Sequence, residues 1–342
     1  MSSISWLRKL TWMLIVALFT LPTFSFAPLN ISSGLPTRNG PVPCATISIL
    51  TFNNPGSDPL GTLESVTIPL KRVGKLFLIE AKVDNETGNF VFDTGSSRLV
   101  LNKTYFRKYI SDETETAGGV TGATAPVGRI KVKQLQVGGL VYNNVPADVT
   151  NLGHIENRRG VKILGLFGFS MLRNLEVVID VNHNELRLYR IDKSGNRISS
   201  ARGGRFDLIQ KVELHHDVMF VQAKVGGKLL DFCLDTGAES NVLHSLSSKK
   251  ALSSVSIQRR SGLVGAGCSS TDVLYGVMND FMIGDRPISN MQTIVTNMEC
   301  MSESYGMPVD GMLGYDFFCQ GEISVNMIRK EIGITFSKQG AL

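Results

Sequence analysis

Apolar residues along the chain occur mostly in short runs that are separated by Gly, Asn and Asp. β-Branched and aromatic residues dominate these runs, which is the composition of β-strands. The strand pattern is clearest in VTIPL (66–70), KLFLIEAKV (75–83), FVFDTG (90–95), RIKVKQLQV (129–137) and LEVVIDV (175–181). Helical periodicity is scarce, and short helices are expected only near 104–110 and 170–174. The pattern therefore predicts an all-β fold.

The second half of the chain repeats the strand pattern of the first half. The segment LIEAKV (78–83) precedes Asp93 and the segment FVQAKV (220–225) precedes Asp235, with ten positions from the last Val to the Asp in both halves. Further along the chain, GLFGFSML (165–172) matches GMLGYDFF (311–318).

A matching turn lies between these landmarks. The turn VGG (137–139) corresponds to IGD (283–285), and its central Gly lies 30 positions before the later Gly in each half. The interval from Asp to turn is 45 positions in the first half and 49 in the second, so a small insertion lies there. Four landmarks in one order indicate an internal duplication and two homologous lobes.

Composition outside the repeat predicts two connecting segments. Residues 28–64 are rich in Pro, Gly, Ser and Asn, which is typical of an extended arm or a pro-segment. The stretch KSGNRISSARGGR is polar and rich in Gly and Ser, which is typical of a linker. We therefore expect a signal peptide or anchor at 1–27, the arm at 28–64, an N-terminal lobe at 65–192, the linker at 193–206 and a C-terminal lobe at 207–338.

The first residues of the chain predict export. Arg8 and Lys9 precede an apolar stretch from Leu10 to Leu21, and Ser-Phe-Ala follows at 25–27. This arrangement is typical of a secretory signal peptide, and the apolar stretch is short for a membrane span. Cleavage of the segment and its retention as a membrane anchor both stay open. We expect an exported protein, periplasmic or secreted, with a membrane-anchored protein as the alternative.

Composition and charge exclude several partners. The chain has 342 residues and a net charge of +5, without a basic block interleaved with aromatic residues, so nucleic acid is not an expected partner. No Cys-x-x-Cys motif or His cluster indicates zinc, and we expect no metal and no other cofactor. The sequence does not decide between disulfides and free thiols for the five cysteines, which are Cys44, Cys233, Cys268, Cys300 and Cys319.

The repeated Asp carries the candidate chemistry. FVFDTGSS (90–97) and FCLDTGA (232–238) both place Asp-Thr-Gly directly after an apolar strand. The Gly permits a tight turn, and the Thr hydroxyl can bond to the backbone. Two lobes related by a pseudo-twofold axis would bring Asp93 and Asp235 together, and such a pair shares one proton. It can activate a water and polarise a carbonyl, which is general acid–base chemistry for amide hydrolysis without a metal.

These paired motifs and the two later Gly elements resemble the bacterial aspartyl protease family, whose lobes are similar to the retroviral (retropepsin) type. The resemblance covers about residues 65–338. It implies the acid protease fold, with two homologous retropepsin-like closed-barrel lobes and pseudo-twofold symmetry. It also implies an aspartic endopeptidase without a cofactor, whose polypeptide substrate lies extended between the lobes. We expect this enzyme to be a monomer.

The resemblance implies roles for individual residues. Asp93 and Asp235 would be the catalytic pair, and the segments 166–168 and 312–314 would cross behind their loops. The two threonines of the motifs would form an interlocked hydroxyl network, and the serines would form hydrogen bonds around the first Asp. The supporting active-site loops would consist of Thr94, Gly95, Ser96, Ser97, Thr236, Gly237 and Ala238. The candidate flaps would contain Gly119, Thr121, Gly122, Gly265 and Gly267.

Three further expectations concern the site. Glu239 follows Ala238 directly, and because unpaired acids are rarely buried we expect its carboxylate to point to solvent. We expect an acidic to mildly acidic pH optimum, because the shared proton is lost as pH rises. The alternative function is a catalytically inactive peptide-binding module on the same fold, which would tolerate the loss of either Asp.

Overall fold

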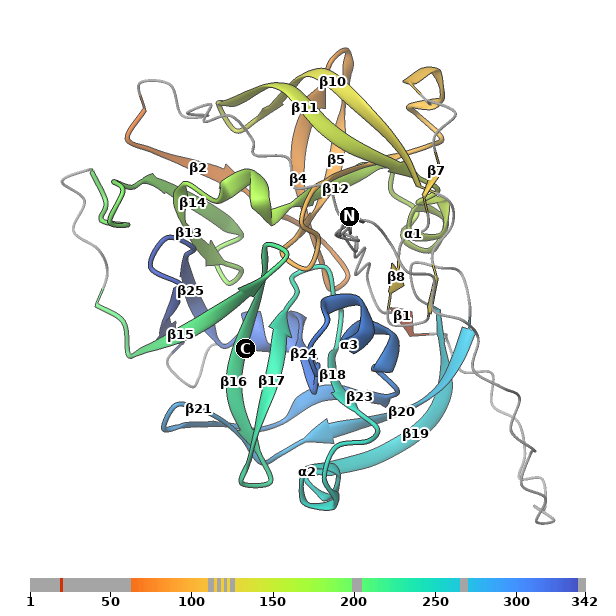
Figure 1. Cartoon of the computed structure of the whole chain (residues 1–342), viewed down its shortest axis with the longest axis vertical. Coiled ribbons are helices and arrows are strands. Elements are labelled where there is room, and N and C mark those ends of the chain that lie inside the picture. The colour runs from red at the N-terminus through yellow and green to blue at the C-terminus, as the bar shows by residue number, and fades with distance from the viewer. Residues whose placement is uncertain are drawn as a thin grey trace, which may run out of the picture.

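The structure is a computed structural model, and it describes residues 19–20, 63–109, 114–115, 118–119, 122–123, 127–198, 205–264 and 270–337. Apart from residues 19–20 and 63–64, the segments predicted at 1–27 and 28–64 lie outside this part of the chain. Two lobes of β-strands lie one above the other in Figure 1. The predicted all-β fold with two homologous lobes is confirmed.

The N-terminal lobe is a closed barrel. Its strands are β3 (Lys71–Val73), β4 (Leu76–Val83), β5 (Glu86–Asp93), β6 (Leu99–Asn102), β7 (Thr114–Glu115), β10 (Val127–Val137), β11 (Leu140–Thr150) and β12 (Ile163–Gly168). Six of them follow the order β4-β5-β12-β6-β11-β10, and β10 pairs back onto β4, which closes the barrel. The short strands β8 (Gly118–Gly119) and β9 (Gly122–Ala123) pair with each other.

The C-terminal lobe repeats this barrel with one interruption. Its strands are β16 (Val218–Val225), β17 (Lys228–Leu234), β18 (Asn241–His244), β19 (Val255–Val264), β20 (Ser270–Met278), β21 (Phe281–Ile283), β22 (Arg286–Ile288), β23 (Met291–Thr296) and β24 (Gly311–Leu313). The order β16-β17-β24-β18-β23-β20 matches that of the first barrel. The strand β21 follows β20 and pairs with β16, so it closes this barrel. The two-residue strand β1 (Phe19–Thr20) pairs with the end of β19.

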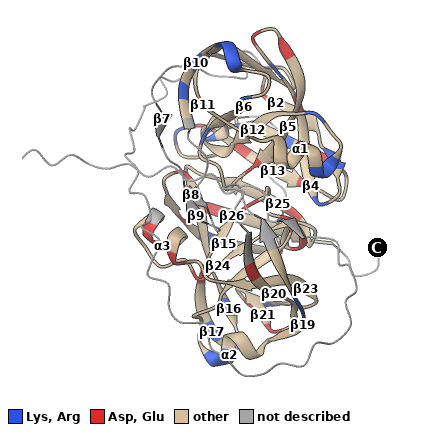
Figure 2. Cartoon of the chain, turned by 90° about the vertical axis from the view of Figure 1, so that its right-hand side faces the viewer, with Lys and Arg blue, Asp and Glu red and all other residues tan. Residues whose placement is uncertain are grey.

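Short helices complete both lobes. They are η1 (Arg107–Tyr109, a 3-10 helix), α1 (Gly153–Arg159), η2 (Phe169–Leu172, a 3-10 helix), α2 (Lys249–Ser253), α3 (Glu299–Tyr305) and α4 (Tyr315–Phe318). The helices expected near 104–110 and 170–174 are confirmed as η1 and η2. The equivalent helices α1 and α3 differ in charge, because α1 ends in two arginines and α3 carries two glutamates (Figure 2). Over the described ranges, no helix is both long enough and apolar enough to cross a membrane.

A six-stranded antiparallel sheet joins the lobes. It consists of β2 (Ser65–Pro69), β13 (Leu175–Asp180), β14 (Glu185–Arg190), β15 (Leu208–His215), β25 (Gly321–Asn326) and β26 (Glu331–Phe336), in the order β15-β26-β25-β13-β14-β2. The central pair β13 and β25 places Val177 opposite Val325. Each lobe therefore contributes three strands to a shared layer, which fixes the lobes relative to each other.

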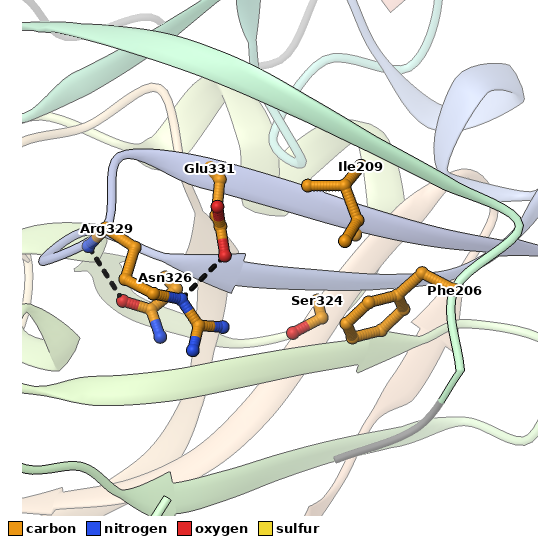
Figure 3. Close-up of a pocket in the computed structure, with 7 residues that line it drawn as sticks. Phe206, Ile209, Ser324, Asn326, Arg329 and Glu331 are labelled. Carbon is orange, nitrogen blue, oxygen red and sulfur yellow. Dashed lines mark hydrogen bonds and ion pairs between the residues drawn. The ribbon is translucent and has the colours of Figure 1, made fainter. Parts of the chain in front are cut away.

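A buried polar network reinforces this shared sheet. Glu176 accepts a hydrogen bond from Arg197 at 2.8 Å and another from the Ser324 hydroxyl at 2.7 Å. Burial alone would raise the pKa of Glu176, but these two bonds and the positive charges of Arg197 and Arg329 outweigh burial and hold the pKa below its usual value. Figure 3 shows a small hollow on the same sheet, where Arg329 forms an ion pair with Glu331 at 2.6 Å. No residue of the Asp-Thr-Gly loops lines this hollow.

Two matched hydrophobic clusters show the duplication in three dimensions. The first, here the N-cluster, consists of Leu76, Leu78, Val91, Val100, Leu152, Ile155, Ile163 and Leu166. Each of these residues has a counterpart in a second cluster, here the C-cluster. The counterpart lies 142 positions later in the sequence for the first four residues and 146 positions later for the last four. These members are Val218, Phe220, Cys233, Val242, Met298, Met301, Val309 and Met312. The change in shift equals the four-residue insertion in the repeat.

Candidate active site

The two Asp-Thr-Gly motifs lie at equivalent ends of barrel strands. The strand β5 ends at Asp93, and β17 ends one residue before Asp235. A parallel neighbour supports each strand, β12 beside β5 and β24 beside β17. Behind each loop, an amide of the neighbouring element donates a hydrogen bond to a loop carbonyl, Phe169 N to Ser96 O and Tyr315 N to Ala238 O, both at 2.9 Å. The Gly elements thus cross behind the loops.

The two threonines of the motifs connect the lobes through four buried hydrogen bonds. The amide of Thr94 donates to Thr236 Oγ1 at 3.0 Å, and the Thr94 hydroxyl donates to the Leu234 carbonyl at 2.9 Å. The reciprocal bonds run from the Thr236 amide to Thr94 Oγ1 at 3.0 Å and from the Thr236 hydroxyl to the Phe92 carbonyl at 2.7 Å. This reciprocal network holds the two loops in one fixed relation.

Backbone amides orient both carboxyl groups. Asp93 Oδ1 accepts hydrogen bonds from the amides of Gly95 at 2.9 Å and Ser96 at 3.0 Å. Asp235 Oδ1 accepts one from the amide of Gly237 at 2.7 Å. Within the described part of the chain, both Oδ2 atoms are buried and lack a hydrogen-bond partner. One oxygen of each carboxyl group is therefore left for a proton, a water or a substrate.

Each carboxyl group lies against the glycine of the opposite motif. A Cβ atom at Gly95 would lie 2.6 Å from Asp235 Cγ, and a Cβ atom at Gly237 would lie 3.0 Å from Asp93 Cγ. Real Cβ atoms do not approach carbon so closely without displacing it. The glycines therefore leave room for two carboxyl groups in one site, a requirement that a single motif does not reveal.

Burial is the main reason why the pKa of both carboxyl groups rises. It raises the pKa of Asp93 well above its usual value, and the negative charge of Asp235 raises it further. Burial also raises the pKa of Asp235 to about 7, against hydrogen bonds that favour its ionised form. Both residues are 0 % exposed. Two like charges in such a site do not ionise together readily, so when one carboxyl group ionises the other keeps its proton.

The remaining loop residues differ between the lobes. Ser96 binds Asp93 through its amide, but its hydroxyl donates to the Arg98 carbonyl at 3.1 Å. Ser97 is half-buried. Ala238, the counterpart of Ser96, is buried in the C-cluster. A polar residue after the first motif and an apolar residue after the second therefore make the two halves of the site unequal.

The expectation that Glu239 points to solvent is wrong. Its side chain is 6 % exposed and forms an ion pair with Arg159, at the end of α1 in the other lobe. Glu239 can be buried because Arg159 is its partner. A paired buried carboxylate avoids most of the free-energy cost of an isolated buried charge. No motif marks Arg159, and only its alignment with Tyr305 in the repeat distinguishes it.

Replacement of Arg159 by Met should destabilise the protein by roughly 2–4 kcal/mol, because it leaves Glu239 buried without its partner. The cost falls below that of a fully buried pair, since the Arg159 side chain is 21 % exposed. Urea unfolding measures the change. The exposed pair of Lys71 and Glu80 provides the control, and Lys71→Met should cost less than about 1 kcal/mol. Equal losses of unfolding free energy in the two variants would contradict a stabilising role for the ion pair between Arg159 and Glu239.

The candidate flaps are described in part. Gly119 and Gly122 are paired across the β8–β9 hairpin, and β8 lies beside α3 of the other lobe. Thr121, Gly265 and Gly267 lie outside the described residues. In the C-terminal lobe, β19 and β20 form the long hairpin that leads to the last two positions.

Comparison with known protein families identifies the family of the chain. The family model described as aspartyl protease matches residues 79–171 and 221–317, which is more than half of the chain. Each match contains one Asp-Thr-Gly motif and the Gly element that supports it. No curated protein matches the chain. The double match agrees with the two lobes of the structure, and the chain belongs to the aspartyl protease family.

Proposed function

We propose that the protein is an aspartic endopeptidase in which Asp93 and Asp235 activate a water for attack on a peptide carbonyl. The observation that carries this proposal is the pair of buried carboxyl groups, each packed against the glycine of the other motif. Two such groups with one proton between them contain a base and an acid in one place.

The chemistry follows from the two outer oxygens. The ionised carboxylate accepts a proton from water as the water oxygen attacks the carbonyl carbon, while the protonated carboxyl donates to the carbonyl oxygen. The tetrahedral intermediate collapses when the leaving nitrogen accepts a proton from the pair and one hydroxyl of the intermediate returns a proton to the pair, which restores the single shared proton. Amides fix both inner oxygens, so little reorganisation accompanies these transfers.

The pH dependence of peptide cleavage tests the proposal. Activity requires one protonated and one ionised carboxyl. Burial raises the pKa of Asp235 to about 7, and burial and the charge of Asp235 raise the pKa of Asp93 well above its usual value, so Asp235 ionises around neutrality while Asp93 keeps the proton. We expect kcat/KM for a mixed peptide library, assayed from about pH 3 to about pH 8, to be low at pH 3, where both groups are protonated, and to rise as Asp235 ionises towards neutrality, which is less acidic than the sequence alone suggests. A maximum near pH 3 with a fall towards neutrality would contradict this assignment of the proton.

A peptide-binding module is the competing function. If the full chain and the chain without its N-terminal arm cleave no peptide at any pH but retain peptides in a pull-down, that module replaces the peptidase. Both aspartates are 0 % exposed and a peptide has to reach them, so the chain without its N-terminal arm is tested as well.

A further inference from the structure

The first hairpin of the N-terminal lobe reaches across to the C-terminal lobe. Its strands β3 and β4 are joined by a turn at Gly74, where a φ of +62° favours glycine. Arg72 of β3 and Lys75 of the turn both contact the ring of Tyr315, the first residue of α4 in the other lobe. Two cations of one lobe therefore meet the segment that directly follows the Gly element of the other lobe.

Tyr315 is held by aromatic, cationic and hydrogen-bond contacts at the same time. Its ring stacks on Phe77 of β4 with centroids 5.5 Å apart and an interplanar angle of 17°. Arg72 Cζ lies 5.4 Å and Lys75 Nζ lies 5.2 Å from the centroid of the Tyr315 ring, which is the range of cation–π contacts. Arg72 also donates a hydrogen bond to the Tyr315 hydroxyl. All of these partners belong to the N-terminal lobe, so they fix a side chain of the C-terminal lobe from outside its own barrel.

The next residue, Asp316, extends the contact between the lobes. Its Oδ1 atom accepts a hydrogen bond from Lys75 Nζ at 3.0 Å, and its Oδ2 atom accepts one from the backbone amide of Gln292 on β23 at 2.7 Å. The Asp316 side chain is 17 % exposed, so this ion pair is partly shielded from solvent and from salt. Asp316 thus connects a cation of the N-terminal lobe to the barrel of the C-terminal lobe.

These contacts lie directly behind the loop that carries Asp235. The Tyr315 amide donates a hydrogen bond to the Ala238 carbonyl at 2.9 Å, and the Ala238 amide donates one to the Asp235 carbonyl at 3.2 Å. A continuous series of contacts therefore runs from Arg72 and Lys75 through Tyr315 and Ala238 to Asp235.

The four contact residues differ from their counterparts in the duplicated half. Alignment of the two halves gives, for Arg72, Lys75, Tyr315 and Asp316 in that order, the residues Leu214, Asp217, Phe169 and Ser170. Leu and Asp carry no positive charge, and Phe lacks the hydroxyl. The duplication alone does not explain the two cations, and they distinguish the loop of Asp235 from the loop of Asp93.

We propose that Arg72 and Lys75 are positioning residues of the peptidase, which hold the Asp235 loop in place against Asp93 from the other lobe. Neither residue would touch the substrate, because each acts through Tyr315 and Ala238. Attack on a peptide carbonyl requires both carboxyl groups in one geometry, and a small displacement of either group lowers the rate. The proposal rests on the proposed peptidase function.

Replacement of both cations by Met tests the proposal through kinetics. The double variant of Arg72→Met and Lys75→Met should lower kcat for peptide cleavage roughly three- to tenfold and leave KM within about twofold, because the dyad shifts while the substrate contacts remain. The double variant of Arg72→Lys and Lys75→Arg keeps both cations and should recover most of the lost kcat. A raised KM with an unchanged kcat would overturn the proposal.

Lys71→Met is the matched control. Lys71 is a cation of the same strand, but it pairs with Glu80 of its own lobe at 2.8 Å. Its removal should leave both kcat and KM unchanged. An equal fall of kcat in this control would show that the effect does not come from the contacts with Tyr315 and Asp316.

Amide hydrogen exchange of the full chain tests the positioning without a substrate. The amides of Gly237 and Ala238, which both donate to Asp235, should exchange roughly three- to tenfold faster in the Met double variant than in the wild type. The amides of Gly95 and Ser96 in the other loop should keep their exchange rates. Unchanged rates in the Asp235 loop, or equal acceleration in both loops, would overturn the proposal. If the wild type cleaves no peptide, the proposed peptidase function fails, and the exchange rates still decide whether the two cations position the loop.

Discussion

Asp93→Asn and Asp235→Asn should each reduce kcat/KM for peptide cleavage by roughly 10³-fold or more. Asn keeps the oxygen that accepts the loop amides but neither ionises nor supplies a proton. The two carboxyl groups act as one unit, so the double variant should be little worse than either single variant. Steady-state cleavage of one peptide by all four proteins measures this. Retention of cleavage activity by either single variant would show that the two aspartates do not act as one dyad.

The thermal stability of the two Asn variants distinguishes a loss of catalysis from a loss of the folded state. Burial raises the pKa of both carboxyl groups, so the folded state binds a proton more tightly than the unfolded state. The resulting stabilisation is fully present below the unfolded pKa near 3.8 and is lost as pH rises through the folded pKa near 7 of Asp235. Asn does not ionise. Each variant should therefore melt at a higher temperature than the wild type at pH 7, and the difference should shrink towards pH 4.

The sequence allowed prediction of those features that depend on one segment or on the repeat. Alternating apolar runs predicted β2, β4, β5, β10 and β13, because strand pairing favours the same residues in each. The repeat predicted two homologous lobes, and the paired motifs predicted that Asp93 and Asp235 meet. The short helices α1 and α3 escaped prediction because each has only seven residues and an apolar N-cap residue, Leu152 or Met298, that offers no capping side chain.

Features that depend on contacts between distant segments could not be predicted. Glu239 is buried because it pairs with Arg159. Arg159 lies 80 positions earlier and in the other lobe, so no local sequence pattern connects the two residues. Tyr305 likewise has no motif, and its edge-on packing against Phe220 of β16 is visible only in the structure. Aligning the two halves residue by residue does provide a signal, since it pairs Arg159 with Tyr305 and Ser97 with Glu239. Unlike residues at equivalent positions mark where the lobes differ.

Replacement of Thr94 by Val should destabilise the protein by roughly 2–6 kcal/mol, since it leaves two buried backbone groups without partners, each worth about 1–3 kcal/mol. These groups are the Thr236 amide, which now donates to the Thr94 hydroxyl, and the Leu234 carbonyl, which accepts from it. Val has nearly the same shape as Thr, so the change removes the hydroxyl without opening a cavity. Urea unfolding measures the loss, and peptide cleavage should fall with it because both groups flank Asp235.

Thr94→Ser is the matched control, because it keeps the hydroxyl and deletes only a methyl group. It should cost about 1 kcal/mol and retain most of the activity. Since the network is reciprocal, Thr236→Val should reproduce the effect of Thr94→Val by releasing the Thr94 amide and the Phe92 carbonyl. If Thr94→Val proved as stable as Thr94→Ser, the four hydrogen bonds would not hold the lobes together. The six-stranded sheet alone would then fix the distance between the two aspartates.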